Sequence, residues 1–274
     1  MNLLAFDTST DTMSIAVART VDGRVQQWQH TGVGGAQAST GLIAAILDLM
    51  QQADLKFDAL DAICFGSGPG SFTGLRTACS VAQGLAFGAN VPVLPVASLL
   101  AVAEEARFAA LAGESRGVVT ALLDARMDEM YAATYAFEGD QWTELQGSHL
   151  LRPEDLQAIT QGTANPSAST TVTNTNTNTV FAGNVFAVYG ERLVGLAAAG
   201  AVPRITALPS AAAVVRLAPR LLARGLAVPA AQALPIYIRD KVAKTTEERA
   251  AEKAAAQALT AQQQGLAVPS ASAD

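Results

Sequence analysis

Short apolar runs alternate with stretches of helical periodicity along most of the chain, a pattern typical of an α/β protein. Runs with the length or the alternation of strands cover residues 2–7, 13–19, 25–30, 62–65, 91–96, 118–123, 130–137 and 180–182. Apolar positions that recur every three or four residues predict helices over residues 39–53, 71–87, 99–111 and 210–224. The first three strands follow one another through short turns and are expected to form an antiparallel meander.

The pattern at the start of the chain returns in its second half. In both places an apolar strand ends at an aspartate, a turn follows and a strand returns; the two aspartates are Asp7 and Asp124. This repetition predicts two similar domains in tandem, residues 1–100 and 101–240, with the chain end returning toward the first domain.

Two segments are expected to lie outside any core. Residues 160–179 alternate Thr and Asn and bury too little apolar surface to offset ordering, so they predict a loose surface insertion. Residues 241–274 form an Ala- and Gln-rich tail, predicted to be a frayed helix or disordered.

Composition narrows the class of protein. Half of the residues are hydrophobic and 15% are charged, so a sizeable core is available. The formal charge of −6 argues against a stand-alone nucleic-acid binder. Asp7 interrupts the first apolar run and no basic segment precedes it, so we expect no signal peptide, no membrane span and a cytoplasmic location. Cys64 and Cys79 form no C-x-x-C pair and are expected to be buried, reduced thiols.

A glycine-rich loop at residues 66–70 joins a predicted strand to a predicted helix. Free N–H groups at a helix start attract anions, so one interpretation is a phosphate cradle. The loop lacks the lysine of a P-loop, and its glycine spacing departs from G-x-G-x-x-G. The alternative, a tight turn that seats a helix on a sheet or a partner, is favoured.

The same stretch, GSGPGSFTGLR at residues 66–76, resembles the TsaB (YeaZ) family of bacteria. The resemblance extends over most of the chain through LAFDTST at residues 4–10, DARM at 124–127 and PIYIR at 235–239. It implies a fold of two tandem actin-like (ASKHA, ribonuclease H-like) domains.

The resemblance also implies a function. TsaB proteins are non-catalytic partners that bind and activate TsaD, which transfers a threonylcarbamoyl group onto the tRNA adenosine beside the anticodon with help from the ATPase TsaE. We therefore expect TsaD and TsaE homologues as partners, tRNA only within the complex, and a homodimer in isolation. No cofactor is expected for this chain, since ATP and metal belong to the partner subunits. The rival is a small-molecule ATP phosphotransferase of the actin/sugar-kinase fold.

The helices at residues 39–53 and 71–87 are the predicted partner interface. The first has an apolar set wider than one sheet needs, and the second has small residues that permit close approach. The predicted interface residues are Leu42, Ile46, Leu49, Met50, Phe72, Gly74, Arg76, Ala78 and Val81.

Two hairpins are the candidates for nucleotide chemistry, by analogy with ATP-hydrolysing members of the fold. The second hairpin has no glycine and carries three acids that repel phosphate, so complete ATP catalysis is disfavoured and any binding is expected to be weak. The residues of this weak site are Asp7, Thr8, Ser9, Thr10, Asp124 and Gly183.

Metal catalysis is not expected. The two histidines, His30 and His149, lie far apart, whereas metal-binding relatives hold the ion with an H-x-x-x-H pair on one helix face. No Ser–His–Asp order can be singled out either.

Basic residues recur every four positions on the helix at 210–224. Such a stripe is usually a solvated face; the alternative is phosphate contact with RNA that a partner holds. The candidate tRNA contacts are Arg216, Arg220, Arg239 and Lys241.

Overall fold

The computed structural model describes residues 1–156, 178–193 and 202–239. Met1–Ile238 forms one compact unit, and Arg239–Asp274 forms a second, of which only Arg239 is described. The predicted tail, Lys241 and nearly all of the Thr/Asn-rich insertion therefore lie outside the described residues.

The first sheet has the strand order β3-β2-β1-β4-β5. Strands β1 (Asn2–Asp7), β2 (Thr12–Val21) and β3 (Arg24–Val33) form the predicted antiparallel meander. Strands β4 (Ala62–Gly68) and β5 (Val93–Ala97) continue the sheet parallel to β1.

The second sheet repeats this arrangement in the order β10-β9-β6-β7-β8. Strands β6 (Arg116–Asp124), β7 (Met130–Glu138) and β8 (Gln141–Leu151) form an antiparallel meander. Strands β9 (Asn178–Gly183) and β10 (Arg204–Thr206) run parallel to β6. The repeat inferred from the two aspartate-ended strands is confirmed in the two sheets, and so is the predicted α/β class.

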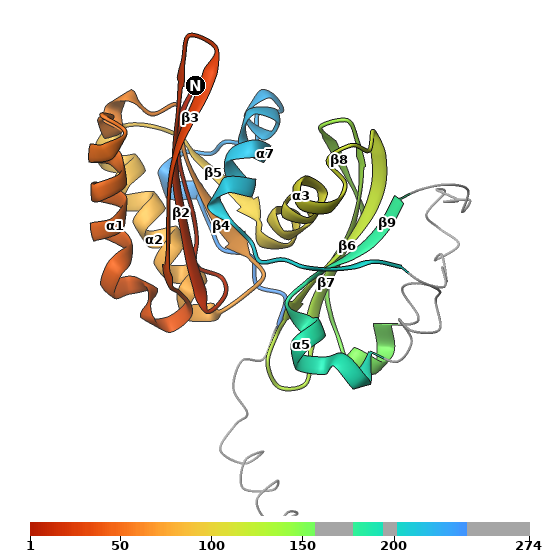
Figure 1. The fold of residues 1–274 in the computed structure, drawn as a ribbon. Coiled ribbons are helices and arrows are strands. Elements are labelled where there is room, and N and C mark those ends of the chain that lie inside the picture. Colours follow the sequence, from red (N-terminus) through yellow and green to blue (C-terminus); the bar gives the residue numbers. More distant parts are fainter. Residues whose placement is uncertain (157–177, 194–201, 240–274) are drawn as a thin grey trace, which may run out of the picture. The chain divides into compact units, whose positions relative to one another are not determined.

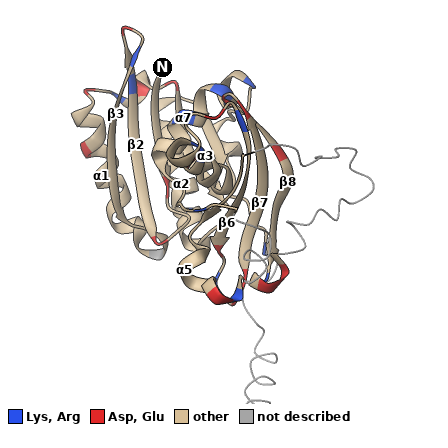
Figure 2. Ribbon diagram, turned by 45° about the vertical axis from the view of Figure 1, so that its right-hand side comes forward, with Lys and Arg blue, Asp and Glu red and all other residues tan. Residues whose placement is uncertain are grey.

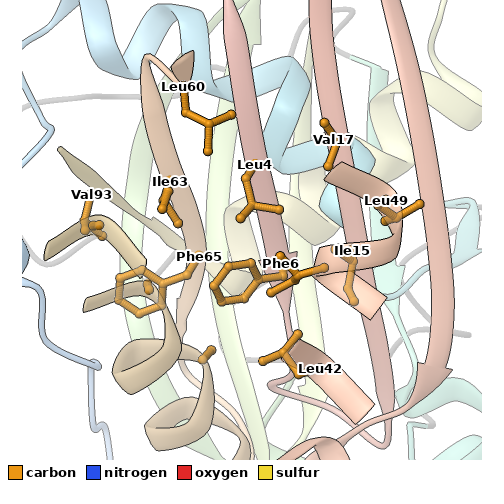
Figure 3. Close-up of a cluster of buried hydrophobic side chains, with 14 of the residues drawn as sticks. Leu4, Phe6, Ile15, Val17, Leu42, Leu49, Leu60, Ile63, Phe65 and Val93 are labelled. Carbon is orange, nitrogen blue, oxygen red and sulfur yellow. The ribbon is translucent and has the colours of Figure 1, made fainter. Parts of the chain in front are cut away.

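Helices α1 (Ala38–Gln52) and α2 (Phe72–Ala89) cover one face of the first sheet (Figure 1). Between them and the sheet lies a core of large apolar side chains, shown in Figure 3. Phe6 of β1 and Phe65 of β4 are fully buried there, next to Leu42 of α1. The helical periodicity of residues 39–53 and 71–87 thus reflects packing on the sheet.

Helix α7 (Ala211–Ala223) covers the other face of the first sheet. Its Val214 and Leu217 pack with Leu3 and Ala5 of β1, so the chain end returns to the first sheet as expected. Ser210 caps α7, accepting a hydrogen bond from the backbone N of Ala213 over 3.0 Å.

Helix α3 (Ser98–Ala110) belongs to both cores. Ala101 packs against the first sheet, while Leu99 and Val102 pack against the second. The boundary predicted near residue 100 thus falls at a shared helix, within the compact unit Met1–Ile238. Helix α5 (Val185–Tyr189) packs on the opposite face of the second sheet. In the described part of the chain, no helix is both long and apolar enough to cross a bilayer.

Candidate functional site

Asp7, at the end of β1, is completely buried. Its Oδ1 accepts hydrogen bonds from Ser9 N over 2.8 Å and Ser9 Oγ over 2.6 Å, and its Oδ2 accepts one from Ser98 Oγ over 2.8 Å. Burial raises the pKa of Asp7, and the bonds from Ser9 and Ser98 oppose that rise. Because Ser98 begins α3, the carboxylate also lies at the positive end of that helix. Both oxygens are therefore engaged inside the protein.

The rest of the first hairpin is packed against the glycine-rich loop. Thr8 Oγ1 donates to the carbonyl of Gly74 over 2.7 Å, and the backbone N of Ser71 donates to the carbonyl of Ser9 over 2.6 Å. A Cβ on Gly70 would lie 2.4 Å from the Ser9 carbonyl oxygen, which backbone cannot accommodate. Thr10 Oγ1 is bonded within its own turn, to Thr12. The loop is thus a close-packed turn that seats α2 on the hairpin.

Asp124, at the end of β6, is held by its own neighbours. Its Oδ1 accepts hydrogen bonds from Tyr189 Oη over 2.7 Å and from the backbone N of Arg126 over 2.9 Å. Its backbone N donates to Asn184 Oδ1 over 2.8 Å. Burial, followed by the bond to Asp124, raises the pKa of Tyr189, so this hydroxyl remains a donor.

The turn after Asp124 is strained and closed by ion pairs. Arg126, Met127 and Asp128 have φ values of 61°, 56° and 61°, in the left-handed region that residues with a side chain rarely adopt. Arg126 pairs with Asp11 on the first hairpin and its guanidinium also lies 3.7 Å from Asp124 Oδ2. Asp128 pairs with Arg192 over 2.7 Å. A guanidinium of this chain thus lies between carboxylates of the two hairpins.

Close packing explains why position 183 is a glycine, and the sequence alone did not reveal this packing. A Cβ there would lie 1.7 Å from the carbonyl oxygen of Leu122, so only glycine permits the approach of β9 to β6. Within the described residues, no three His, Cys, Asp or Glu side chains come together as a metal site.

The predicted partner interface is corrected in its main part. Leu42, Ile46, Leu49, Met50 and Ala78 are buried in the first core and are not available to a partner in this conformation. Gly74 faces inward too, since a Cβ there would lie 1.9 Å from the Thr8 carbonyl oxygen. Most of the apolar residues of α1 therefore pack in the core of this chain, and only the remaining ones are available to a partner.

Other residues of the two helices face outward. Ile43 and Leu47, one turn apart on α1, are 51% and 52% exposed, and Phe87 near the end of α2 is 83% exposed. Val81 is half-buried against the first core. Five exposed residues of α2 form a row along the helix, which we call the exposed row of α2: Thr73, Arg76, Ser80, Gly84 and Phe87.

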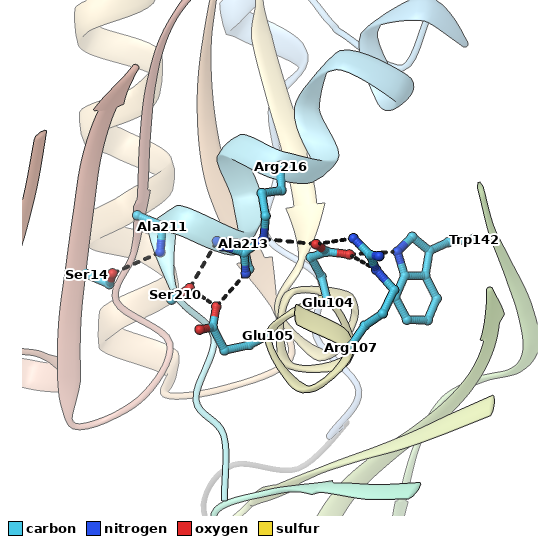
Figure 4. Close-up of polar contacts among 9 residues, drawn as sticks. All are labelled: Ser14, Glu104, Glu105, Arg107, Trp142, Ser210, Ala211, Ala213 and Arg216. Carbon is cyan, nitrogen blue, oxygen red and sulfur yellow. Dashed lines mark hydrogen bonds and ion pairs between the residues drawn. The ribbon is translucent and has the colours of Figure 1, made fainter. Parts of the chain in front are cut away.

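Arg216 and Arg220, predicted as tRNA contacts, are engaged within the protein. Arg216 donates from Nε to Glu104 over 2.9 Å and from its terminal nitrogen to Glu105 over 2.8 Å, as Figure 4 shows. Arg220 pairs with Asp140 over 2.6 Å. Figure 2 shows basic and acidic segments close together around α7.

The acid at the centre of this network is Glu104, only 2% exposed. It also receives hydrogen bonds from Arg107 and from the indole N–H of Trp142, at 2.8 Å and 3.1 Å (Figure 4). Arg216 thus ties α7 to α3, whereas Arg220 bonds to Asp140 between β7 and β8. Phosphate contact by Arg216 would require breaking its bonds to Glu104 and Glu105.

Sequence reasoning missed one further arrangement, along the flank of α2. Residues 233–238, here called the strap, run beside this helix. The Ala233 carbonyl accepts from Gln83 Nε2 over 2.8 Å and from Cys79 Sγ over 3.3 Å. At the other end of the strap, Tyr237 Oη accepts from Arg76 Nε over 3.1 Å. The PIYIR motif was the available signal, but its contacts depend on tertiary structure.

The comparisons with known proteins agree with this architecture. Residues 32–247 match the family model described as TsaD, tRNA N6-adenosine threonylcarbamoyltransferase. The protein called tRNA threonylcarbamoyladenosine biosynthesis protein TsaB in Haemophilus influenzae is 36% identical over 173 residues, which cover 59% of this chain and 67% of that protein. Its Escherichia coli namesake is 34% identical over 155 residues, covering 56% of this chain and 64% of that protein.

Two solved structures from Pseudomonas aeruginosa share the fold over nearly their whole length. One, called YeaZ, has a TM-score of 0.66 and 33% identity, covering 86% of this chain and 99% of the other. The second, described as similar to peptidase YeaZ, has a TM-score of 0.69 and 34% identity, covering 87% and 99%. Sequence and fold agree, and the chain belongs to the TsaB (YeaZ) family, whose named members act in tRNA threonylcarbamoyladenosine biosynthesis.

Proposed function

We propose that this chain is a non-catalytic subunit that binds and activates a TsaD homologue for threonylcarbamoyl transfer onto the adenosine beside the anticodon of tRNA. In this proposal the partner subunits bind ATP and metal, and a TsaE homologue assists them. This chain contacts tRNA only within the complex. In the absence of the partner, the same face supports a homodimer.

The observation that carries the partner proposal is a pair of glycines in α2. A Cβ on Gly84 or Gly88 would meet nothing within 4 Å, so the fold of this chain does not require glycine at either position. Glycine inside a helix costs ~1 kcal/mol relative to alanine. Two such positions on an exposed surface fit a second backbone that approaches α2 closely, a use for which glycine is suited.

Exposed apolar side chains support the same face. Ile43 and Leu47 of α1 point away from the core, and α1 and α2 cover the same side of the first sheet (Figure 1). Contact with a partner would bury these side chains and would favour binding by about 25 cal/mol for each Å² of apolar surface removed from water.

The non-catalytic part of the proposal is supported by the two hairpins. The carboxylate oxygens of Asp7 are used by Ser9 and Ser98, and Oδ1 of Asp124 is used by Tyr189 and Arg126. Asp7 therefore has no free oxygen with which to hold a magnesium ion unless these bonds break, and the remaining oxygen of Asp124, Oδ2, lies 3.7 Å from the Arg126 guanidinium. The rival phosphotransferase reading draws no support from this geometry.

A binding experiment tests the proposal. The purified chain and the purified TsaD homologue of the same organism should form a complex, measured by isothermal titration calorimetry. Leu47→Asp should weaken the complex about tenfold or more, because it brings a charge into an apolar contact. Val25→Asp, at a 64% exposed position of β3, is the matched control and should bind normally. A wild-type chain that does not bind, or that hydrolyses ATP at a rate lost in Asp7→Asn, would contradict the proposal.

A further inference from the structure

The strap presents apolar side chains on a fixed backbone. Leu234 is 68% exposed, and Ile236 and Tyr237 are each nearly half exposed, although three large apolar side chains within four residues are costly to leave in water. The backbone beneath them is anchored, since Ile236 N donates to the Ser67 carbonyl over 2.7 Å. The backbone of the strap is thus held in place by the fold of this chain.

Arg76 joins the strap to the exposed row of α2. Its guanidinium lies 3.7 Å from the centre of the Phe72 ring, and the Phe72 and Tyr237 rings lie 5.0 Å apart. Among the described residues no carboxylate pairs with Arg76, in contrast to Arg216 and Arg220. The cation is therefore oriented by aromatic rings and carries an unmatched charge.

We propose that the strap and Arg76 form a second part of the partner face, which receives an apolar segment of the TsaD homologue that bears a carboxylate. This inference rests on the proposed function, because it assigns further residues to the same partner. Arg76 belongs to the exposed row of α2 and also contacts Tyr237, so the two parts are continuous. The unmatched guanidinium selects an acidic partner group.

The composition of this surface fits a protein better than RNA. Tyrosine and arginine are enriched among the residues that dominate the energetics of protein interfaces. An RNA-binding surface would instead place several cations around the rings, whereas the exposed side chains that the strap adds before Tyr237 are those of Leu234 and Ile236, both apolar.

The test compares matched pairs of variants by calorimetry against the purified TsaD homologue. Leu234→Asp and Arg76→Gln should each raise the Kd about tenfold, the loss expected when a central anchor or a buried charge partner is removed. Leu145→Asp on β8 and Arg24→Gln at the start of β3 change the same residue types at other exposed positions and should leave the Kd unchanged. Raising the salt concentration should weaken the wild-type complex more than the Arg76→Gln complex.

Each outcome decides a separate point. If Leu234→Asp and Arg76→Gln bind normally while Leu47→Asp does not, the inference is overturned and the proposed function stands. A wild-type chain that does not bind overturns both. If Arg76→Gln weakens binding of tRNA but not of the TsaD homologue, the surface belongs to RNA and the inference is overturned. Leu234→Asp keeps the test decisive if Arg76→Gln lowers the melting temperature, since the Leu234 side chain is mostly exposed and its replacement removes little packing.

Discussion

Ser98 Oγ donates a hydrogen bond over 2.8 Å to Oδ2 of Asp7 and thereby joins the first residue of α3 to the end of β1. Gly66 makes room for this carboxylate, because a Cβ there would lie 1.7 Å from Asp7 Oδ2. Since α3 packs in both cores, Asp7 helps to fix the element that the two sheets share. An aspartate at this position is thus explained by structure alone.

Asp7→Asn should change how stability depends on pH. Burial raises the pKa of Asp7 in the folded protein above its value in the unfolded chain, so the stability that Asp7 contributes is present at low pH and is lost as pH rises through the raised value. The asparagine side chain of the variant does not ionise, so the variant does not lose stability in this way as the pH rises. The difference in free energy of unfolding between variant and wild type should therefore shift in favour of the variant from about pH 4 to about pH 7.

Urea unfolding over that pH range measures this difference. Asp58→Asn, at an exposed position, is the control and should follow the wild type. A difference that stays constant with pH would show that Asp7 has the same protonation behaviour in both states.

Gly74→Leu should destabilise the protein itself rather than only detach a partner. The new side chain would meet the Thr8 carbonyl, a backbone group that cannot move aside. Overpacking of this kind costs ~1–3 kcal/mol or more, visible as a lower melting temperature. Gly84→Ala, in open space on the same helix, should instead raise stability by ~0.5–1 kcal/mol. Equal melting temperatures for the two variants would contradict this assignment.

Glu104→Ala should be strongly destabilising. Glu104 is buried, and its removal leaves Arg107 without its paired acid and Arg216 with Glu105 alone, a loss of ~3–5 kcal/mol for a broken buried pair. Asp140→Ala breaks the exposed pair with Arg220 and should cost only ~0–1 kcal/mol. Chemical denaturation of both variants provides the comparison, and similar losses would mean that the Glu104 network is not a structural centre.

Cys64 should resist thiol reagents in the folded protein. It is fully buried in β4, and burial raises the pKa of its thiol to about 12, so the reactive thiolate is scarce at neutral pH. Its reaction with a chromogenic disulfide should proceed at the rate of global unfolding and accelerate in urea. Labelling within seconds in native buffer would show that β4 opens locally.

The sequence was sufficient for the repeated α/β framework, because the apolar runs and the aspartate-ended strands are local signals. It did not reveal β8, whose residues are mostly exposed and therefore lack an apolar alternation. The short strand β10 was missed as well, because three residues carry too little pattern.

The candidate site was harder to predict than the fold. Helical periodicity identified the apolar residues of α1 but could not say which of them face the sheet, so Leu42 and Ile46 were assigned outward while Ile43 and Leu47 are the exposed ones. The arginine spacing on α7 was read correctly as a stripe, but its acids lie more than seventy residues away in sequence. Such pairings depend on tertiary contacts that spacing does not encode.

The return of α7 to the first sheet has a consequence for biosynthesis. The backbone N of Ala211 bonds to Ser14 Oγ, a contact between residues 197 positions apart. Until α7 leaves the ribosome, one face of the first sheet, with Leu3, Ala5 and Leu94, remains uncovered. Domains generally fold as units during synthesis, and exposed apolar sheet surface is prone to aggregate. The nascent chain therefore carries an incompletely covered sheet until most of its length has been translated, and its exposure to aggregation ends only when α7 docks.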